Sequence, residues 1–121
     1  HGVEGLDELS IAGETMVGEL KGGQVLEYRV EPAQFGLQTH PTRAIQVGSV
    51  EESKEIIQAV LANQPGPARD IVALNAGASV YVAGAAASLA EGVSKAQAVI
   101  ASGAAQDKLI AYQAYAAARR G

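Results

Sequence analysis

Alternating apolar and polar residues near the start of the chain predict a β-hairpin with strands over residues 15–21 and 24–30. The second strand repeats apolar and charged side chains with a period of two: Leu26, Glu27, Tyr28, Arg29 and Val30. That period places the apolar side chains on one face and leaves the other face in water. Gly22 and Gly23 lie between the strands and supply the positive φ values that a two-residue turn needs. The apolar residues 9–12 predict a further short strand before the hairpin.

After a connecting segment, residues 31–48, the pattern changes to a helical period. We expect four helices, over residues 49–62, 68–87, 88–101 and 105–119. A serine followed three residues later by a glutamate opens the first and the third of them, which is the pattern of a capping box. Proline and glycine residues break the chain between the first two helices.

The predicted helix over residues 68–87 carries Gly77 and Gly84, which lie two helical turns apart on one face. We interpret both glycines as allowing a neighbouring helix to approach. Asn75 on the same helix is expected to bond to a neighbouring backbone or helix, because buried amides are normally satisfied. The last helix is expected to place three side chains in the core: Leu109, Ile110 and Tyr112.

Composition limits the function classes. At 121 residues the chain is about one domain, and much of its 48% hydrophobic content is alanine, so we expect a thin core of closely packed helices. The formal charge of −4 comes without a basic stripe, which excludes nucleic-acid binding. The absence of cysteine fits a reducing compartment, the cytoplasm. Residues 71–90 are uncharged but have too few large aliphatic side chains for a membrane span, and they predict a buried helix.

The one constellation that suggests chemistry is the pair Asp7 and Glu8, which follows Gly5 in a glycine-flanked loop. Such a loop can turn carboxylate oxygens toward a hard cation that bridges to phosphate. No nucleophile–base arrangement or dinucleotide-binding loop is present, so no catalytic residue is assigned. His40 has no carboxylate or second histidine near it in sequence, so we do not expect it to bind a metal.

The loop Gly5–Glu8 closely resembles the Gly-Leu-Asp-Glu loop of the anthranilate phosphoribosyltransferases. Further segments resemble that family in the same order and at similar spacing: Glu31–Leu37, Gly66–Ala76, Tyr81–Gly84, Ser88–Gly92 and Ala101–Ala104. Several matching segments in order are far more specific than any one of them.

This resemblance implies an α/β fold of the phosphoribosyltransferase and nucleoside phosphorylase type, of which this piece is a β-hairpin followed by about four helices. It also implies the transfer of the phosphoribosyl group of phosphoribosyl pyrophosphate (PRPP) to anthranilate in tryptophan biosynthesis. Asp7 and Glu8 match the family's magnesium-binding pair, so Mg²⁺ is the implied cofactor. The family forms homodimers, and neither a nucleic acid nor a membrane is implied as a partner.

The family's glycine-rich phosphate loop, its anthranilate-binding arginine and its helical N-terminal domain have no counterpart in these residues. We therefore expect residues 1–121 to be the C-terminal part of the α/β catalytic domain, roughly the last third of the enzyme. The isolated chain is expected to be inactive, because the phosphate loop is missing.

Two alternatives remain open at this point. A pyrimidine nucleoside phosphorylase has a related fold, and a screen of anthranilate with PRPP against thymidine with phosphate would separate the two enzymes. A non-catalytic helical assembly module would explain the alanine-rich helix faces, and it would show no Mg²⁺–PRPP effect in calorimetry.

Overall fold

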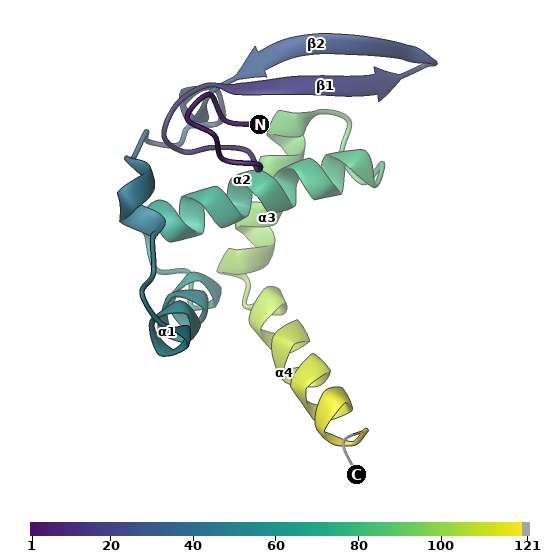
Figure 1. Ribbon diagram of the computed structural model, residues 1–121. Helices are drawn as coiled ribbons and strands as arrows, with labels where there is room; N and C mark the ends of the chain where they lie inside the picture. Colours follow the sequence, from purple (N-terminus) through teal and green to yellow (C-terminus); the bar gives the residue numbers. More distant parts are fainter. Residues whose placement is uncertain (120–121) are drawn as a thin grey trace.

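The computed structural model describes residues 1–119, in which an antiparallel hairpin lies over a group of four helices (Figure 1). Strands β1 (Thr15–Lys21) and β2 (Gln24–Val30) have the predicted bounds. They pair from Thr15 opposite Val30 to Lys21 opposite Gln24. Gly22 and Gly23 turn the chain with φ values of 58° and 78°, which confirms the predicted two-residue turn.

The helices are α1 (Val50–Leu61), α2 (Pro67–Val82), α3 (Leu89–Ala101) and α4 (Ala104–Ala117). Two short 3₁₀ turns, at Pro32–Phe35 and Thr42–Ile45, lie in the connecting segment. The predicted caps are present, because the hydroxyls of Ser49 and Ser88 each accept a hydrogen bond of 3.1 Å, from the N–H groups of Glu52 and Glu91. None of the helices within residues 1–119 is long and apolar enough to cross a membrane.

The predicted strand over residues 9–12 does not form. The reason is that side chains and a distant loop take up its backbone groups. The N–H groups of Ser10 and Ala12 bond to serine and threonine hydroxyls, and the carbonyl of Ile11 accepts a 2.8 Å bond from the N–H of His40. The segment therefore has no strand partner and instead lines the core with Ile11, which is 1% exposed.

Helix α2 is shorter than predicted and ends at Val82 instead of residue 87. Gly84 adopts a left-handed conformation with φ of 75°, which ends a helix and needs no Cβ. The prediction that Gly84 shares a helix face with Gly77 is therefore wrong. Gly84 turns the chain toward α3.

Helix α4 also differs from the prediction, because it leaves the core and projects away from the other helices (Figure 1). Leu109 is half-buried, whereas Ile110 and Tyr112 are 57% and 66% exposed. Gly103, with φ of 81°, redirects the chain between α3 and α4. The alanines of α4 surround the helix and give it no dominant apolar stripe that could draw it back.

The core lies where α2 and α3 cross under the N-terminal loop and the connecting segment. Its buried centre consists of Ile11, Leu37, Leu74 and Val93. The helices approach closely at Gly77 of α2 and Gly92 of α3, both of which are buried. A Cβ atom on Gly92 would lie 2.2 Å from the carbonyl oxygen of Gly77. The interpretation of Gly77 as a site of helix approach is confirmed, and Gly92 is its partner.

Above α2, the far half of the hairpin is held by a network of polar side chains. The hydroxyls of Tyr81 on α2 and Tyr28 on β2 donate to the carboxylate of Glu19 on β1, at 2.6 Å and 3.0 Å. The ammonium group of Lys21 donates to the Tyr81 hydroxyl at 3.0 Å. The Tyr81 hydrogen bond, followed by that of Tyr28, lowers the pKa of Glu19. Burial and then the bond to Glu19 raise the pKa of Tyr28 to about 12.

Replacing Gly92 with alanine should destabilise the protein by about 1–3 kcal/mol, because the added methyl meets the backbone of α2 and the helices must separate. The better helix propensity of alanine returns only about 1 kcal/mol. Chemical denaturation measures the difference. A Gly13→Ala variant is the control, since a Cβ at Gly13 has no neighbour within 4 Å. Equal stability of the Gly92→Ala variant and the parent would contradict the close contact.

The Tyr28 network should make stability depend on pH in the alkaline range. The pKa of Tyr28 rises from 10.0 to about 12 on folding, so its stabilising effect is complete below pH 10 and is lost as the pH rises toward 12. Tyrosinate absorbance should show a late-ionising phenol that disappears in Tyr28→Phe. In the control Tyr112→Phe, at an exposed position, the late step should persist. A late step unaffected by Tyr28→Phe would assign it to another phenol.

Candidate functional site

Both predicted acids lie at one cleft, between the hairpin and α2. The cleft has a volume of about 620 Å³. Asp7 and Glu8 line it together with Met16 and Val17 of β1 and Ala78 and Val82 of α2. Both acids are exposed, so solvent can reach them at the cleft.

The loop that carries the acids is folded back on itself just before them. The carbonyl of Leu6 accepts a 2.7 Å hydrogen bond from the N–H of Gly2, and the carbonyl of Gly2 accepts one of 3.0 Å from Gly5. Gly5 has φ of 102°, a conformation that favours glycine. The loop is also paired with β1, because the N–H of Met16 donates to the carbonyl of His1 at 2.9 Å. The chain therefore reaches Asp7 along a fixed path.

Two buried hydroxyls fix the chain after the acids. Ser10 and Thr15 are each only 2% exposed. The hydroxyl of Thr15 accepts from the N–H of Ser10 at 2.9 Å, and the hydroxyl of Ser10 donates to the carboxylate of Glu4 and accepts from the N–H of Ala12. Glu4 is thus used inside the loop and differs from Asp7 and Glu8, which face the cleft.

Asn75 connects this loop to α2. Its Oδ1 accepts a 2.9 Å hydrogen bond from the N–H of Leu9, and its Nδ2 donates to the carbonyl of Leu9, also at 2.9 Å. A third bond, of 3.1 Å, runs from Nδ2 to the carbonyl of Ile71. The expectation that Asn75 bonds to a neighbouring backbone is confirmed. The sequence did not predict which residue this backbone belongs to; it is Leu9, which directly follows Glu8.

The two acids at the cleft, Asp7 and Glu8, suit Mg²⁺ better than a metal ion whose ligands all come from the protein. In residues 1–119 no three His, Asp or Glu side chains are grouped so that they could hold a metal ion. Mg²⁺ commonly takes one or two carboxylates and completes its shell with water and substrate phosphates. Asp7 and Glu8 fit that chemistry. As exposed acids they can also act through water molecules.

His40 and Asp70 meet at the other end of α2, where their Nε2 and Oδ2 atoms are 4.0 Å apart. Asp70 is 9% exposed, and the guanidinium of Arg69 lies 3.6 Å from it. Sequence reasoning did not foresee a carboxylate beside His40, since the two are 30 positions apart in the chain. A negative charge in the first turn stabilises a helix through its dipole, and this gives Asp70 a structural role in α2.

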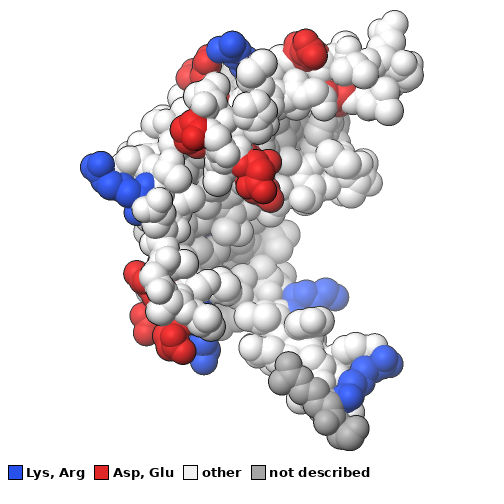
Figure 2. Space-filling model, in the orientation of Figure 1, with Lys and Arg blue, Asp and Glu red and all other residues white. Residues whose placement is uncertain are grey.

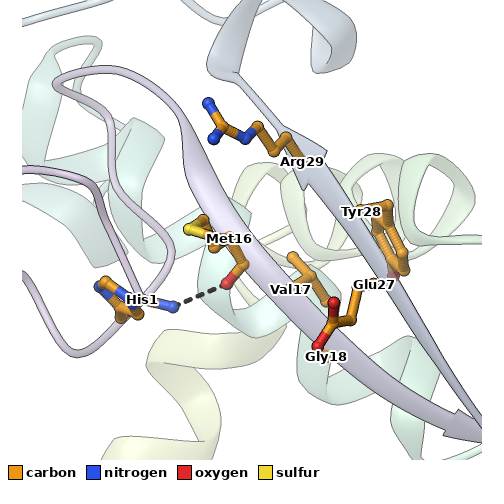
Figure 3. Close-up of a pocket in the computed structure, with 7 residues that line it drawn as sticks. All are labelled: His1, Met16, Val17, Gly18, Glu27, Tyr28 and Arg29. Carbon is orange, nitrogen blue, oxygen red and sulfur yellow. Dashed lines mark hydrogen bonds between the residues drawn. The ribbon is translucent and has the colours of Figure 1, made fainter.

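Two other hollows adjoin the hairpin. One, of about 700 Å³, continues along β1 to Tyr81 and the α2–α3 turn and is lined mainly by apolar side chains. The other, of about 330 Å³, lies against both strands, and Figure 3 shows it with the terminal amine of His1 donating to the carbonyl of Met16 at 2.8 Å. Neither hollow is lined by Asp7 or Glu8.

Charged side chains are spread over the face of the molecule that Figure 2 shows. Figure 2 shows acidic side chains over the N-terminal part and around α1, and separate basic side chains both near them and in the region of α4. Arg29 on β2 is paired with Glu14 at 2.7 Å, outside the cleft. The visible face carries no basic patch of the kind that binds nucleic acid.

Comparison with known proteins places these features in a family. A sequence model described as "Glycosyl transferase family, a/b domain" matches residues 1–106. The chain is 58% identical over 105 residues to the anthranilate phosphoribosyltransferase of Nitrosospira multiformis, covering 87% of this chain and 30% of that protein. The chain spans about a third of the length of the curated relatives it matches.

Solved structures agree. The anthranilate phosphoribosyltransferase of Thermus thermophilus superposes with a TM-score of 0.84 at 41% identity, over 93% of this chain and 33% of that one. A variant of the Saccharomyces cerevisiae enzyme with Mg bound superposes with a TM-score of 0.75 at 27% identity, over 89% and 32%. With the family match extending over residues 1–106, the chain belongs to the glycosyl transferase family, as part of its a/b domain.

Proposed function

We propose that the chain is the C-terminal part of the α/β catalytic domain of an anthranilate phosphoribosyltransferase. Such an enzyme transfers the phosphoribosyl group of PRPP to anthranilate and releases pyrophosphate, a step of tryptophan biosynthesis. The observation that carries the proposal is the Gly-Leu-Asp-Glu loop, which turns Asp7 and Glu8 into the β1–α2 cleft in a chain of this family. In the complete enzyme, which we propose to be a homodimer, other segments would hold the sugar and anthranilate.

The reaction requires charge neutralisation. The bond from the ribose C1 to pyrophosphate breaks, a bond from C1 to the amino nitrogen of anthranilate forms, and that nitrogen loses a proton. Negative charge builds on the leaving pyrophosphate, and a bound Mg²⁺ would supply positive charge there. The magnesium seen in the yeast relative supports this requirement.

Asp7 and Glu8 cannot bind a diphosphate by themselves, because like charges repel. Two unit charges 4 Å apart repel by about 4 kcal/mol at the effective dielectric of a protein surface. Two exposed acids beside a diphosphate are therefore unfavourable unless a divalent cation lies between them. In the proposed role, both carboxylates hold and orient the hydrated cation and take no part in proton transfer.

The double variant Asp7→Ala, Glu8→Ala of the full-length enzyme should lose roughly 10²-fold in turnover at limiting Mg²⁺, because the cation loses its protein anchor. Initial rates over a Mg²⁺ series measure this. The matched control is Glu27→Ala, Glu55→Ala, which removes two exposed acids outside the cleft and should behave like the parent. An unchanged Mg²⁺ profile in the Asp7, Glu8 variant would refute the assigned role.

The substrate assignment can be tested separately. The full-length enzyme should form phosphoribosyl-anthranilate from PRPP and anthranilate and should leave thymidine with phosphate unreacted. Product analysis by mass spectrometry distinguishes the two reactions. Cleavage of thymidine would favour the pyrimidine nucleoside phosphorylase alternative. The absence of any Mg²⁺–PRPP heat in calorimetry would favour the non-catalytic module.

A further inference from the structure

We propose that Asn75 is a positioning residue for the metal-binding loop, and that its carboxamide fixes the direction in which Asp7 and Glu8 face the cleft. The inference rests on the proposed function. It adds a residue of α2 that lies 66 positions from the loop it controls.

The geometry of the contact is that of a clamp. The carboxamide of Asn75 pairs with both backbone polar groups of Leu9, accepting from the N–H and donating to the carbonyl, each at 2.9 Å. One hydrogen bond would leave the loop free to swivel about it. Two bonds from a planar group to one residue fix orientation as well as distance. Leu9 directly follows Glu8, so the clamp acts at the closest backbone position after the acids.

The base of the clamp lies in a buried part of α2. The second N–H of the Asn75 carboxamide donates to the carbonyl of Ile71, which locks the side chain on its own helix. Ala73 and Leu74, the preceding residues, are each 1% exposed. Gly77, two residues on, forms the closest contact with α3. A side chain rooted there transmits the position of the helix pair to the loop.

The remaining contacts complete the support on both sides of the acids. Leu6, the residue before Asp7, is held through its carbonyl by Gly2, and Ser10 is held by Thr15. These contacts lie within the N-terminal segment and its hairpin and shape the loop from that side. The Asn75 clamp is the direct hydrogen-bonded tie from the loop to α2, which is the opposite wall of the cleft.

The test measures Mg²⁺ binding to the full-length enzyme by calorimetry, in the presence of PRPP. Asn75→Ala should weaken Mg²⁺ affinity roughly tenfold, as is usual when a residue that orients a metal ligand is removed. Saturating Mg²⁺ should restore most of the turnover, which a general loss of structure would not allow. Gln97→Ala is the matched control, since it removes an exposed amide from α3 and should bind Mg²⁺ like the parent.

Asn75→Leu provides a second variant that keeps the branched shape of the side chain and removes its polar atoms, in case the alanine variant does not fold. In either variant the amide of Leu9 should exchange its hydrogen faster, which reports loss of the clamp without reference to metal. Faster exchange together with unchanged Mg²⁺ affinity would overturn the proposal, because the loop would then be free and the site unaffected.

A double-mutant cycle separates this inference from the proposed function. In the Asp7→Ala, Glu8→Ala background, Asn75→Ala should cause no further loss of Mg²⁺ affinity, because the groups it positions are absent. An equal loss in both backgrounds would show that Asn75 acts by another route. If removal of the two acids alone leaves Mg²⁺ affinity unchanged, the metal role of the loop fails, whatever the result for Asn75.

Discussion

The arrangement of this molecule depends on one side chain that bonds to both backbone polar groups of one distant residue. Through Asn75, the first residues of the chain are fixed to a helix residue that lies 66 positions later in the sequence. Ile11 and Leu74 are each 1% exposed and belong to one buried cluster, against which Leu9 packs, so the hydrogen bonds form at the margin of the core. Apolar burial gives the loop its affinity for α2, since it is not directional. The carboxamide gives it an orientation, which the proposed metal role of the loop would require.

A small core, in which alanine and glycine accompany a few larger aliphatic side chains, limits how such an orientation can be supported. Small side chains bury little area each, so stabilisation must come from many atoms packed at short range. The meeting of Gly77 and Gly92 is one result, because backbone there packs directly on backbone. A larger residue at either position would increase the distance between α2 and α3 and would shift Asn75, which lies on the same helix as Gly77. Tight packing of the helices and placement of the acids are therefore connected through the same helix.

The sequence predicted correctly the elements that local residues determine, and its predictions were wrong where contacts with distant residues determine the structure. The hairpin follows from alternation and from Gly22-Gly23, and the helix starts follow from serine caps, all within a few residues. The strand over residues 9–12 was wrong because Asn75, Thr15 and His40 satisfy its backbone from outside. The predicted end of α2 was wrong because the sequence alone does not show whether Gly84 continues a helix or ends it. Asp7 and Glu8 were predicted from their motif, and the structure places both at one cleft. The backbone partner of Asn75, in contrast, depends on a tertiary contact that no local pattern encodes.

The ties at the two ends of β1 have a mechanical consequence. At one end the strand is paired with the loop that Asn75 holds, and at the other Glu19 reaches Tyr81 on the same helix. Because β1 is tied at both ends, it cannot open and close over the cleft as a loop hinged at one end would. The gap beneath it is thus shaped before anything enters, and a ligand need not spend binding energy on closing it.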